Sequence, residues 1–373
     1  MKIIIKIVIV ILNVIYALFK LLPSKKQVLF MSRQSNNISM DFKLLGDELK
    51  KEYKVIYLCK TLDGKEDAKI KTLISYGFHM LKQMYYLATS KVCILDSYIP
   101  TVSILNHKKQ NTIIQMWHSN GTMKKFGYTA LSKAEGTSNT YATMLKMHKN
   151  YDIILCSGEA YRDHLAKGFN VDPNTIQIYS LPRIDVLNDK KYEKDIQKKI
   201  YKKYPELKNN KKQNVIYAPT FRKDETEFEK YLNDLIDNID LNKYNLIIKL
   251  HPLSKVETTN DKVIIDKSFS TFDMLFVADK LISDYSCVIY EAGVRNIPLY
   301  FYAYDLDNYE TVRGLALDYN ELPGYTEKEA SKLCKSLGKK YDQKELKDFI
   351  NKYVENTKEC TKKIASLVKE KMQ

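Results

Sequence analysis

The sequence lacks the compact motifs that build zinc sites, disulfide frameworks and nucleotide-binding loops. Its six cysteines are scattered, with no Cys-x-x-Cys pair and no histidine clustered beside them. This distribution is typical of reduced, mostly buried thiols in a cytosolic compartment. No GxxxxGKS or GxxxxGKT loop, GxGxxG fingerprint or HExxH motif is present, and no clear Asp-x-Asp pair follows a predicted strand. We therefore expect neither a metal ion nor a bound cofactor at the functional site.

Arginine is also scarce, although positive charge is abundant. Lysine and arginine together number 60 against 45 acidic residues, which gives a formal net charge of +15 at pH 7. Such a balance suits nucleic acid, an anionic membrane or phosphate-rich substrates. No compact arginine–aromatic motif for nucleic acid is present, so we rank membrane and phosphate first and expect no nucleic-acid partner. With 373 residues and 45% apolar content, the chain is long and apolar enough for two globular domains.

The N-terminus contains a long apolar run, at residues 3–22, about the length of a bilayer-spanning helix. A narrow polar stripe suits a helix lying in the membrane interface equally well; it consists of Lys2, Lys6, Asn13 and Lys20. Residues 23–26 offer no small-x-small cleavage site, so we do not expect a cleaved signal peptide. The basic residues that follow predict attachment to the cytoplasmic face of the cell membrane.

Short apolar segments alternate with helical patterns along most of the remaining chain. In its first part we expect strands at residues 28–32, 54–59, 92–95, 112–117 and 153–156. The same rhythm restarts in the second part, with strands at 215–217, 246–250, 263–265, 280–283 and 299–302. Strands that alternate with helices predict an α/β fold with parallel sheets covered on both faces.

The same pattern divides the chain into four expected parts. They are a membrane-attachment helix at 1–26, a first α/β domain at 27–189, a basic linker helix at 190–212 and a second α/β domain at 213–373 that includes the C-terminal helices. The lysine-rich linker is most simply a solvated helix before Pro205, and a surface that touches anionic lipid is the alternative.

Residues 281–319 contain a strand, a polar turn, a helix and a second strand. The turn consists of Ser283, Asp284, Tyr285 and Ser286. Doubly wound sheets bind ligands at the carboxyl ends of their strands, and a helix N-terminus attracts phosphate. This stretch therefore predicts a phosphate site, although an ordinary N-cap role for Ser286 explains the same pattern.

Two histidines, His118 and His251, lie directly at the ends of predicted strands. We expect each to face the crevice at the edge of its sheet, so that the two meet across a cleft between the two domains. Histidine is the side chain best matched to proton transfer near neutral pH. The alternative for either one is a structural, hydrogen-bonded histidine.

Other strand ends carry cations and hydroxyls that suit a phosphate ligand. Thr220 and Arg222 close the first strand of the second half, and Arg183 closes the first half. Lys249 should point the same way as His251 because alternate strand residues share a face. Arg313 stands beside a glycine that permits close backbone approach, so it is a further phosphate-clamp candidate.

These pieces together resemble the CDP-glycerol glycerophosphotransferases of wall teichoic acid synthesis. The matching segments are QMWHSNGTMKKFG, LPRID, YAPTFR, IIKLHP, LISDYSCVIYE, FYAYDLDNYETVRG and LDY, in the family's order over residues 113–319. The resemblance implies a glycosyltransferase-B-like fold of two Rossmann domains, monotopic membrane attachment and transfer of a polyol phosphate from a CDP-linked donor.

The resemblance also implies roles for individual residues. His118 and His251 carry over as the catalytic pair. The residues placed around the donor are Arg183, Pro219, Thr220, Lys249, Ser286, Cys287 and Glu291. The strand-end motifs complete the expected substrate-binding set with Trp117, Ser119, Lys124, Arg222, Ser283, Asp284 and Arg313.

The version of the histidine motif, Trp117-His118-Ser119-Asn120-Gly121, looks more like the primase branch of this family. The resemblance then implies addition of the first glycerol phosphate to an undecaprenyl-diphosphate-linked saccharide, and the absence of the polymerases' extra N-terminal domain favours the same branch. Cys287 and Glu291 stand where serine and aspartate are common in the family, so the donor could be CDP-glycerol or CDP-ribitol. A polymerising enzyme, or one that acts in capsule synthesis, is also an alternative to a primase.

Two other functions fit parts of the sequence. A glycosyltransferase that uses a nucleotide sugar could share the fold. A non-catalytic basic adaptor for membranes or nucleic acid ranks last, because it gives no task to the two strand-end histidines.

Overall fold

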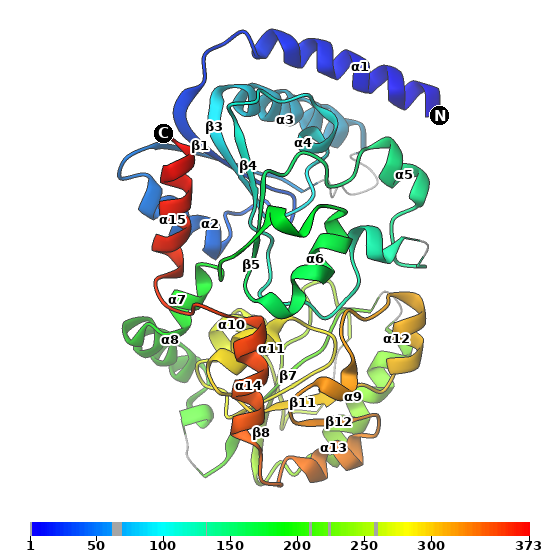
Figure 1. Ribbon diagram of the computed structural model, residues 1–373. Coiled ribbons are helices and arrows are strands. Elements are labelled where there is room, and N and C mark those ends of the chain that lie inside the picture. Colours follow the sequence, from blue (N-terminus) through cyan, green and yellow to red (C-terminus); the bar gives the residue numbers. More distant parts are fainter. Residues whose placement is uncertain (1, 62–68, 132, 209–210, 223–224, 257–259) are drawn as a thin grey trace. The chain divides into compact units, whose positions relative to one another are not determined.

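The computed structural model describes residues 2–61, 69–131, 133–208, 211–222, 225–256 and 260–373 (Figure 1). The chain forms two compact units. The first comprises Met1–Ser119, Lys125–Asp185 and Glu355–Gln373, and the second comprises Asn120–Lys124 and Val186–Val354. Each unit contains a 6-stranded sheet whose paired strands are all parallel. The expected α/β class with parallel sheets is therefore confirmed.

The first sheet has the order β2-β1-β3-β4-β5-β6. Its strands are β1 (Lys25–Ser32), β2 (Lys54–Cys59), β3 (Ser90–Leu95), β4 (Thr112–Gln115), β5 (Ile153–Cys156) and β6 (Ile176–Ile178). The chain winds outward in both directions from β1 and β3, so the strand order reverses between these two neighbours. In doubly wound sheets a ligand crevice lies at the carboxyl ends of the strands at this point.

Helices cover this sheet. They are α2 (Met40–Leu49), α3 (Lys69–Thr89), α4 (Pro100–Ile104), α5 (Asn139–Met144), α6 (Arg162–Phe169) and α15 (Cys360–Lys371), with α7 (Arg183–Leu187) at the end of the first unit. The last helix differs from expectation, because α15 lies beside α2 rather than in the second domain (Figure 1). Its apolar face, at Ile364 and Val368, is completely buried with Phe42 and Leu45 of α2.

Helix α1 (Lys2–Phe19) is docked onto the first unit by the side that carries Asn13 and Tyr16. The fully buried Tyr16 places its hydroxyl 2.9 Å from Nδ1 of His107. The Asn13 side chain donates to the carbonyl of Ile104 at 3.0 Å and accepts from the amide of Asn106 at 2.9 Å. The opposite side of α1 exposes a row of apolar side chains: Ile3, Ile7, Val10, Ile11, Val14 and Leu18. By length and composition alone, this helix is long enough to cross a membrane.

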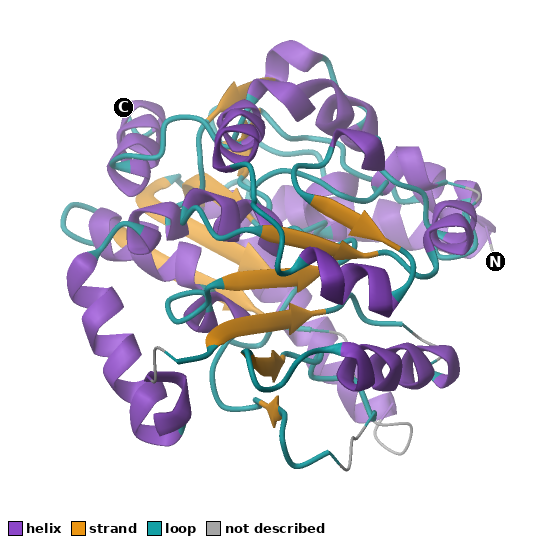
Figure 2. Cartoon of the chain, turned by 90° about the horizontal axis from the view of Figure 1, so that it is seen from below, coloured by secondary structure: helices purple, strands orange, loops and turns teal. Residues whose placement is uncertain are grey.

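The second sheet has the order β12-β11-β10-β7-β8-β9. Its strands are β7 (Gln213–Ala218), β8 (Tyr244–Ile248), β9 (Ile264–Ile265), β10 (Lys280–Ser283), β11 (Leu299–Tyr302) and β12 (Tyr325–Glu327). The strand order reverses between β7 and β10, whose last residues, Ala218 and Ser283, are paired. In Figure 2 strands (orange) run side by side with helices (purple) packed against them.

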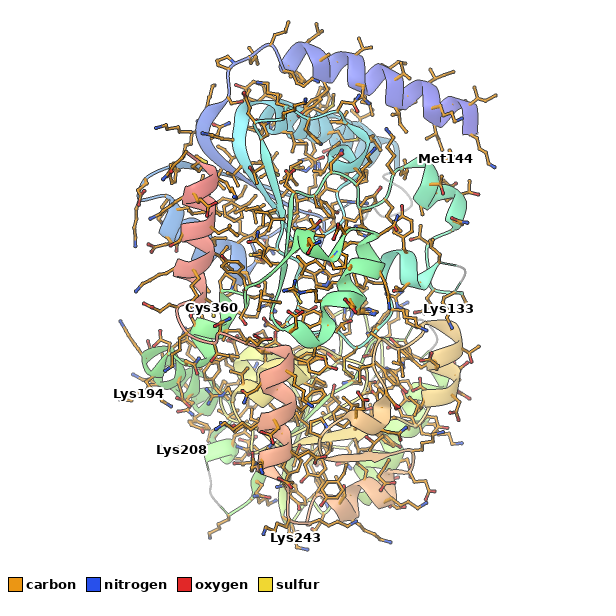
Figure 3. The ribbon with its side chains drawn as sticks, viewed as in Figure 1. Lys133, Met144, Lys194, Lys208, Lys243 and Cys360 are labelled. Atoms are coloured by element: carbon orange, nitrogen blue, oxygen red, sulfur yellow. The ribbon has the colours of Figure 1, made fainter. Side chains whose placement is uncertain are left out.

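The helices of the second unit are α8 (Lys190–Lys203), α9 (Thr226–Asn238), α10 (Thr271–Met274), α11 (Val288–Val294), α12 (Leu306–Val312), α13 (Ala330–Ser336) and α14 (Gln343–Tyr353). The basic segment before Pro205 is helical, as predicted. Helix α8 buries Ile196 and Ile200, whereas lysines such as Lys194 project away from the ribbon (Figure 3).

The predicted strands at 54–59, 153–156, 280–283 and 299–302 have the observed bounds. The prediction missed β6 and β12, which are only 3 residues long. It also extended β4 to residue 117, where the chain in fact turns sharply.

Candidate functional site

His118 is presented by a strained turn at the end of β4. Trp117, directly before it, adopts the left-handed conformation with φ 64°, which is unusual for a bulky residue. The buried side chain of Gln115 holds this turn, because its Oε1 accepts from the Trp117 amide at 3.0 Å and its Nε2 donates to the Ser97 carbonyl at 3.1 Å. Strain of this kind persists only where the surroundings enforce it, and it concentrates at functional sites.

The hydrogen bonds of His118 determine which ring nitrogen carries the proton. Its Nδ1 lies 2.9 Å from the backbone carbonyl of Asp96, and a carbonyl can only accept a hydrogen bond. This shorter contact places the hydrogen on Nδ1 and the lone pair on Nε2, although the side-chain amide nitrogen of Gln34 lies 3.2 Å from the same Nδ1. Burial lowers the pKa of His118 to about 4, although the bond to Asp96 opposes the shift. At neutral pH the ring is thus a neutral imidazole that can accept a proton at Nε2.

Arg183 supports the same turn instead of offering a free charge. Its Nε donates to Oδ2 of the buried Asp41 at 2.8 Å, and its backbone amide donates to Oδ1 at 2.8 Å. The guanidinium also donates to the carbonyl of His118 at 3.2 Å. The structure therefore assigns Arg183 a positioning contact with His118. Sequence reasoning missed Asp41, Gln115 and Asp96, since no local motif marks these partners.

In the second unit, the expected residues at β7 and β10 do come together where the strand order reverses. The carboxylate of Asp284 accepts from the Thr220 amide at 2.9 and 3.1 Å. Ser283 donates through its hydroxyl to the carbonyl of Ala218 at 2.8 Å. The buried Oγ1 of Thr220 has no hydrogen-bond partner among the described residues, so it can bind a ligand oxygen. Pro219, between these elements, is buried.

Arg222 is held in a buried ion-pair network, which differs from the expected free phosphate clamp. Its guanidinium donates to Asp284 at 2.6 Å and to the two carboxylate oxygens of Asp305 at 3.1 and 3.0 Å. The rings of Tyr285, Tyr304 and Tyr309 surround it, with centroids 5.2–5.4 Å from its central carbon. Two carboxylates neutralise this cation, so its contacts tie β7, β10 and the loop after β11 together.

Asp305 begins an Asp-x-Asp sequence, Asp305-Leu306-Asp307, after β11, where no clear pair was expected. Both carboxylates hold cations of the chain, since Asp305 binds Arg222 and Asp307 lies 2.7 Å from Lys328. In the described part of the chain, no group of three or more His, Cys, Asp or Glu side chains forms a candidate metal site.

Lys249 and His251 do not share an environment, so the expectation from strand alternation is wrong. The buried Lys249 ammonium donates to the Asp266 carboxylate at 2.7 Å, to the Asp266 carbonyl at 2.8 Å and to the Phe269 carbonyl at 2.5 Å. An ammonium has three donors, and these contacts use all of them. His251, in contrast, is exposed and packs against Phe221 with ring centroids 5.0 Å apart.

His251 has the opposite tautomer to His118. Its Nδ1 accepts the backbone amide of Leu253 at 3.2 Å, so in the neutral ring the hydrogen resides on Nε2. Burial and the nearby charge of Lys124 lower its pKa. His251 can therefore donate a hydrogen bond to an incoming ligand.

The segment Asn120–Lys124 lies in the second unit, where it binds α11 and the loop after α12. The Tyr290 hydroxyl donates to the Thr122 carbonyl at 2.6 Å, and the Ala316 amide donates to the Met123 carbonyl at 3.0 Å. Asn120 donates to the buried carboxylate of Glu291 at 3.2 Å. Glu291, expected at the donor, is thus engaged by this segment.

The remaining expected residues lie around the start of α11. Cys287 is its N-cap residue, so the expected N-cap role of Ser286 is wrong; the hydroxyl of Ser286 instead accepts from the amide of Val288 at 3.4 Å. Lys124 is half-buried, and burial lowers its pKa. The negative charge of Asp284 opposes this shift, and the positive charge of Arg313 adds to it. Trp117 and Ser119 are half-buried in the first unit.

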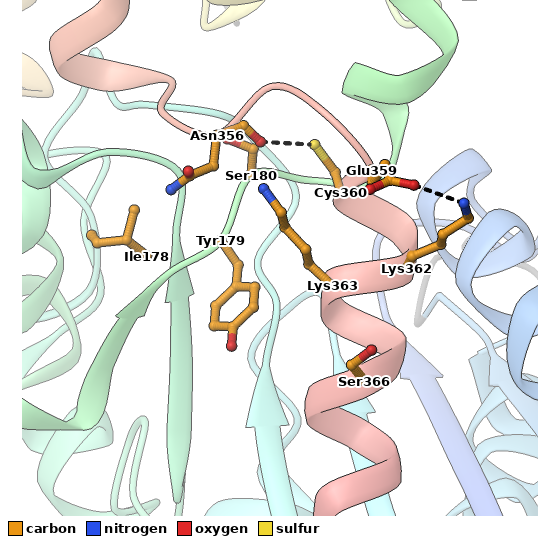
Figure 4. Close-up of a pocket in the computed structure, with 9 residues that line it drawn as sticks. All are labelled: Ile178, Tyr179, Ser180, Asn356, Glu359, Cys360, Lys362, Lys363 and Ser366. Atoms are coloured by element: carbon orange, nitrogen blue, oxygen red, sulfur yellow. Dashed lines mark hydrogen bonds and ion pairs between the residues drawn. The ribbon is translucent and has the colours of Figure 1, made fainter.

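A larger hollow lies elsewhere in the first unit, between the end of β6 and α15 (Figure 4). Its volume is about 520 Å³, and Lys363 points into it, whereas Lys362 is paired with Glu359 at 2.7 Å. It contains none of the predicted site residues. The hollow beside Thr220 and His251 measures only about 10 Å³.

Comparisons with known proteins agree with the sequence resemblance. The family model described as CDP-Glycerol:Poly(glycerophosphate) glycerophosphotransferase matches residues 14–369. A teichoic acid ribitol-phosphate primase of Bacillus spizizenii is 29% identical over 342 residues, which cover 88% of this chain and 86% of that protein. A teichoic acid glycerol-phosphate primase of Bacillus subtilis is 30% identical over 287 residues, covering 74% of this chain and 72% of that protein.

A solved structure of the wall teichoic acid polymerase TagF has a TM-score of 0.72 to this chain at 22% identity. The match covers 98% of this chain and 95% of that one, so the two share their fold.

Proposed function

Because the chain belongs to the CDP-glycerol:poly(glycerophosphate) glycerophosphotransferase family, whose members transfer phosphoalcohol units in teichoic acid synthesis, we propose that it transfers glycerol phosphate from CDP-glycerol to a lipid-linked saccharide. A hydroxyl of the acceptor attacks the phosphorus that carries glycerol. The new O–P bond forms as the bond to CMP breaks, and the hydroxyl proton leaves to a base.

The observation that carries this proposal is the pair of opposite histidine tautomers. His118 has a lone pair on Nε2 and takes the proton from the attacking hydroxyl. His251 has its hydrogen on Nε2 and donates it to the diphosphate or to the departing CMP. Each ring contacts a backbone group, and these contacts support the two proposed roles.

The second unit supplies the groups proposed to bind the donor. The unpartnered Oγ1 of Thr220 can donate to a phosphate oxygen, and Lys124 and Arg313 bring positive charge close to one another. Arg222 shapes this edge of the sheet through Asp284 and Asp305. Charge-assisted hydrogen bonds of this kind are the strong ones for phosphate.

We also propose that α1 lies in the plane of the membrane on its cytoplasmic face. A helix held along one side by Asn13 and Tyr16 presents only its opposite side to lipid. Exposed apolar residues of the neighbouring α3, including Ile74 and Phe78, extend the surface. An amphipathic helix of this kind suits a membrane interface.

The deciding experiment compares donors with the purified full-length protein and an undecaprenyl-diphosphate disaccharide acceptor. Release of CMP from CDP-glycerol, with one or a few units added, supports the proposal. Release of CMP from CDP-ribitol supports a second candidate function, the transfer of ribitol phosphate. The similarity to the ribitol-phosphate primase favours this candidate. Release of UDP from a UDP-sugar, without CMP, would indicate a glycosyltransferase instead.

A further inference from the structure

Arg33 follows β1 at the point where the strand order of the first sheet reverses. Met31 of β1 pairs with Leu95 of β3, and the amide of Arg33 donates to the hydroxyl of Ser97 at 3.0 Å. Ligands of doubly wound sheets bind in the crevice outside this reversal. Arg33 therefore stands at the expected ligand position of the first unit, yet no sequence motif marked it.

The neighbours of Arg33 touch His118. The next residue, Gln34, brings its side-chain amide within 3.2 Å of Nδ1 of His118. Across the sheet edge, Asp96 precedes Ser97 and accepts the His118 hydrogen through its carbonyl. Arg33 is thus connected to His118 along the chain and across the strands.

Arg33 differs from four other arginines of the described structure in its charge balance. Arg162, Arg183, Arg222 and Arg295 each hold a carboxylate. Arg33 forms no ion pair with any described residue, and its Nε is buried without a hydrogen-bond partner. A buried donor and an unpaired cation are costly unless a ligand satisfies them.

The carboxyl of Asp96, directly after β3, does not fill this need. Asp96 is buried, and its Oδ1 also has no hydrogen-bond partner among the described residues. Burial raises the pKa of Asp96 to about 6, which still leaves this carboxyl mostly ionised at pH 7. Asp96 forms no ion pair with Arg33, so the buried Nε of Arg33 remains available to an anionic ligand.

We propose that Arg33 binds a phosphate group of the acceptor beside the hydroxyl that His118 deprotonates. The inference rests on the proposed function and adds a residue that recognises a phosphate of its acceptor. Two phosphates could serve: the diphosphate that joins the saccharide to the lipid, or the phosphodiester of a polyol unit already added. The planar guanidinium can bind either with paired hydrogen bonds.

The test measures KM for each substrate with Arg33→Gln, Arg33→Lys and the wild type. Arg162→Gln is the matched control, because Arg162 is in the same unit and also has a buried, unpartnered Nε, but Glu159 neutralises it. Three acceptors are compared: the lipid-diphosphate disaccharide, the same lipid carrying one polyol phosphate, and a soluble disaccharide carrying a polyol phosphate without the lipid diphosphate.

We expect Arg33→Gln to raise acceptor KM by roughly ten- to a hundredfold, the range for losing a hydrogen bond to a charged group. Arg33→Lys should recover part of this loss, and the donor KM and the control should stay unchanged. A defect seen with all lipid-diphosphate acceptors assigns the lipid diphosphate, and one confined to acceptors with polyol phosphate assigns the phosphodiester. A raised donor KM, or no change in any KM, would overturn the proposal.

A binding measurement separates this inference from the proposed reaction. Calorimetry with glycerol 3-phosphate and with glycerol should show phosphate-dependent binding to wild type that Arg33→Gln weakens. Absence of CMP release from every donor, with this binding intact, would refute the proposed function alone. Equal binding to the wild type and Arg33→Gln would refute the role of Arg33. If Arg33→Gln does not fold, the same calorimetric titrations are made with Arg33→Lys and the wild type. Equal binding of glycerol 3-phosphate and glycerol to the wild type would then refute the role of Arg33.

Discussion

Replacing Arg222 by methionine tests whether this residue stabilises the second unit or binds the donor directly. Methionine keeps much of the side-chain volume but lacks the positive charge that pairs with Asp284 and Asp305. The side chain of Asp284 is 0% exposed, and that of Asp305 is 13% exposed. Leaving a buried carboxylate without its partner costs about 3–5 kcal/mol. We therefore expect the unfolding free energy to fall by about this amount, which corresponds to a melting temperature lower by roughly 6–20 °C.

Thermal and urea unfolding of the full-length protein provide the assay, read alongside the KM for CDP-glycerol. Lys328→Met is the matched control, because it breaks an ion pair with Asp307 whose members are 50% and 88% exposed. That exposed pair should contribute less than about 1 kcal/mol. Arg222→Met with wild-type stability and a strongly raised donor KM would refute the structural role and restore the phosphate clamp.

Three further predictions concern His118, Gly121 and helix α1. Burial lowers the pKa of His118 to about 4, so kcat/KM for CMP release should stay level from pH 7 to about 5 and fall near pH 4 as the ring gains a proton. A fall in kcat/KM already near pH 6.5 would contradict this effect of burial on His118. Gly121→Ala should lower unfolding free energy by about 1–3 kcal/mol in melts, because φ is +69° and a Cβ would lie 2.4 Å from the Tyr290 ring, whereas Gly77→Ala, with nothing within 4 Å, should not destabilise. Val14→Asp, on the exposed side of α1, should weaken vesicle binding at least about tenfold with unchanged melting, and equal loss with the exposed control Ile38→Asp would count against α1 as the lipid contact.

Much of the fold follows from local patterns. Strands at 153–156 and 280–283 are apolar runs followed by polar residues, and this pattern is enough to predict buried parallel strands. Strand β12 lacks such a run, because Tyr325–Glu327 lies at the edge of its sheet with only partial burial. The placement of α15 beside α2 is a long-range packing choice that its amphipathic pattern alone does not specify.

The candidate site shows the same division between local and long-range information. His118, Thr220 and Asp284 could be placed at sheet edges, because a polar residue after a parallel strand has few other positions. Their partners could not, since the contacts of Arg183 with Asp41 and of Lys249 with Asp266 join distant parts of the chain. Such long-range contacts decide whether a cation at a strand end is neutralised by a carboxylate or can bind a ligand, so the sequence alone does not predict which cations bind phosphate.

The central claim is that the chain transfers polyol phosphate with His118 as the base. The most direct measurement is CMP release from CDP-glycerol with a lipid-linked acceptor, comparing wild type with His118→Ala. General base catalysis is worth about 10²–10⁴-fold, so the variant should retain the wild-type melting temperature and lose at least about a hundredfold in rate. Near-full turnover by a well-folded His118→Ala protein would contradict the account.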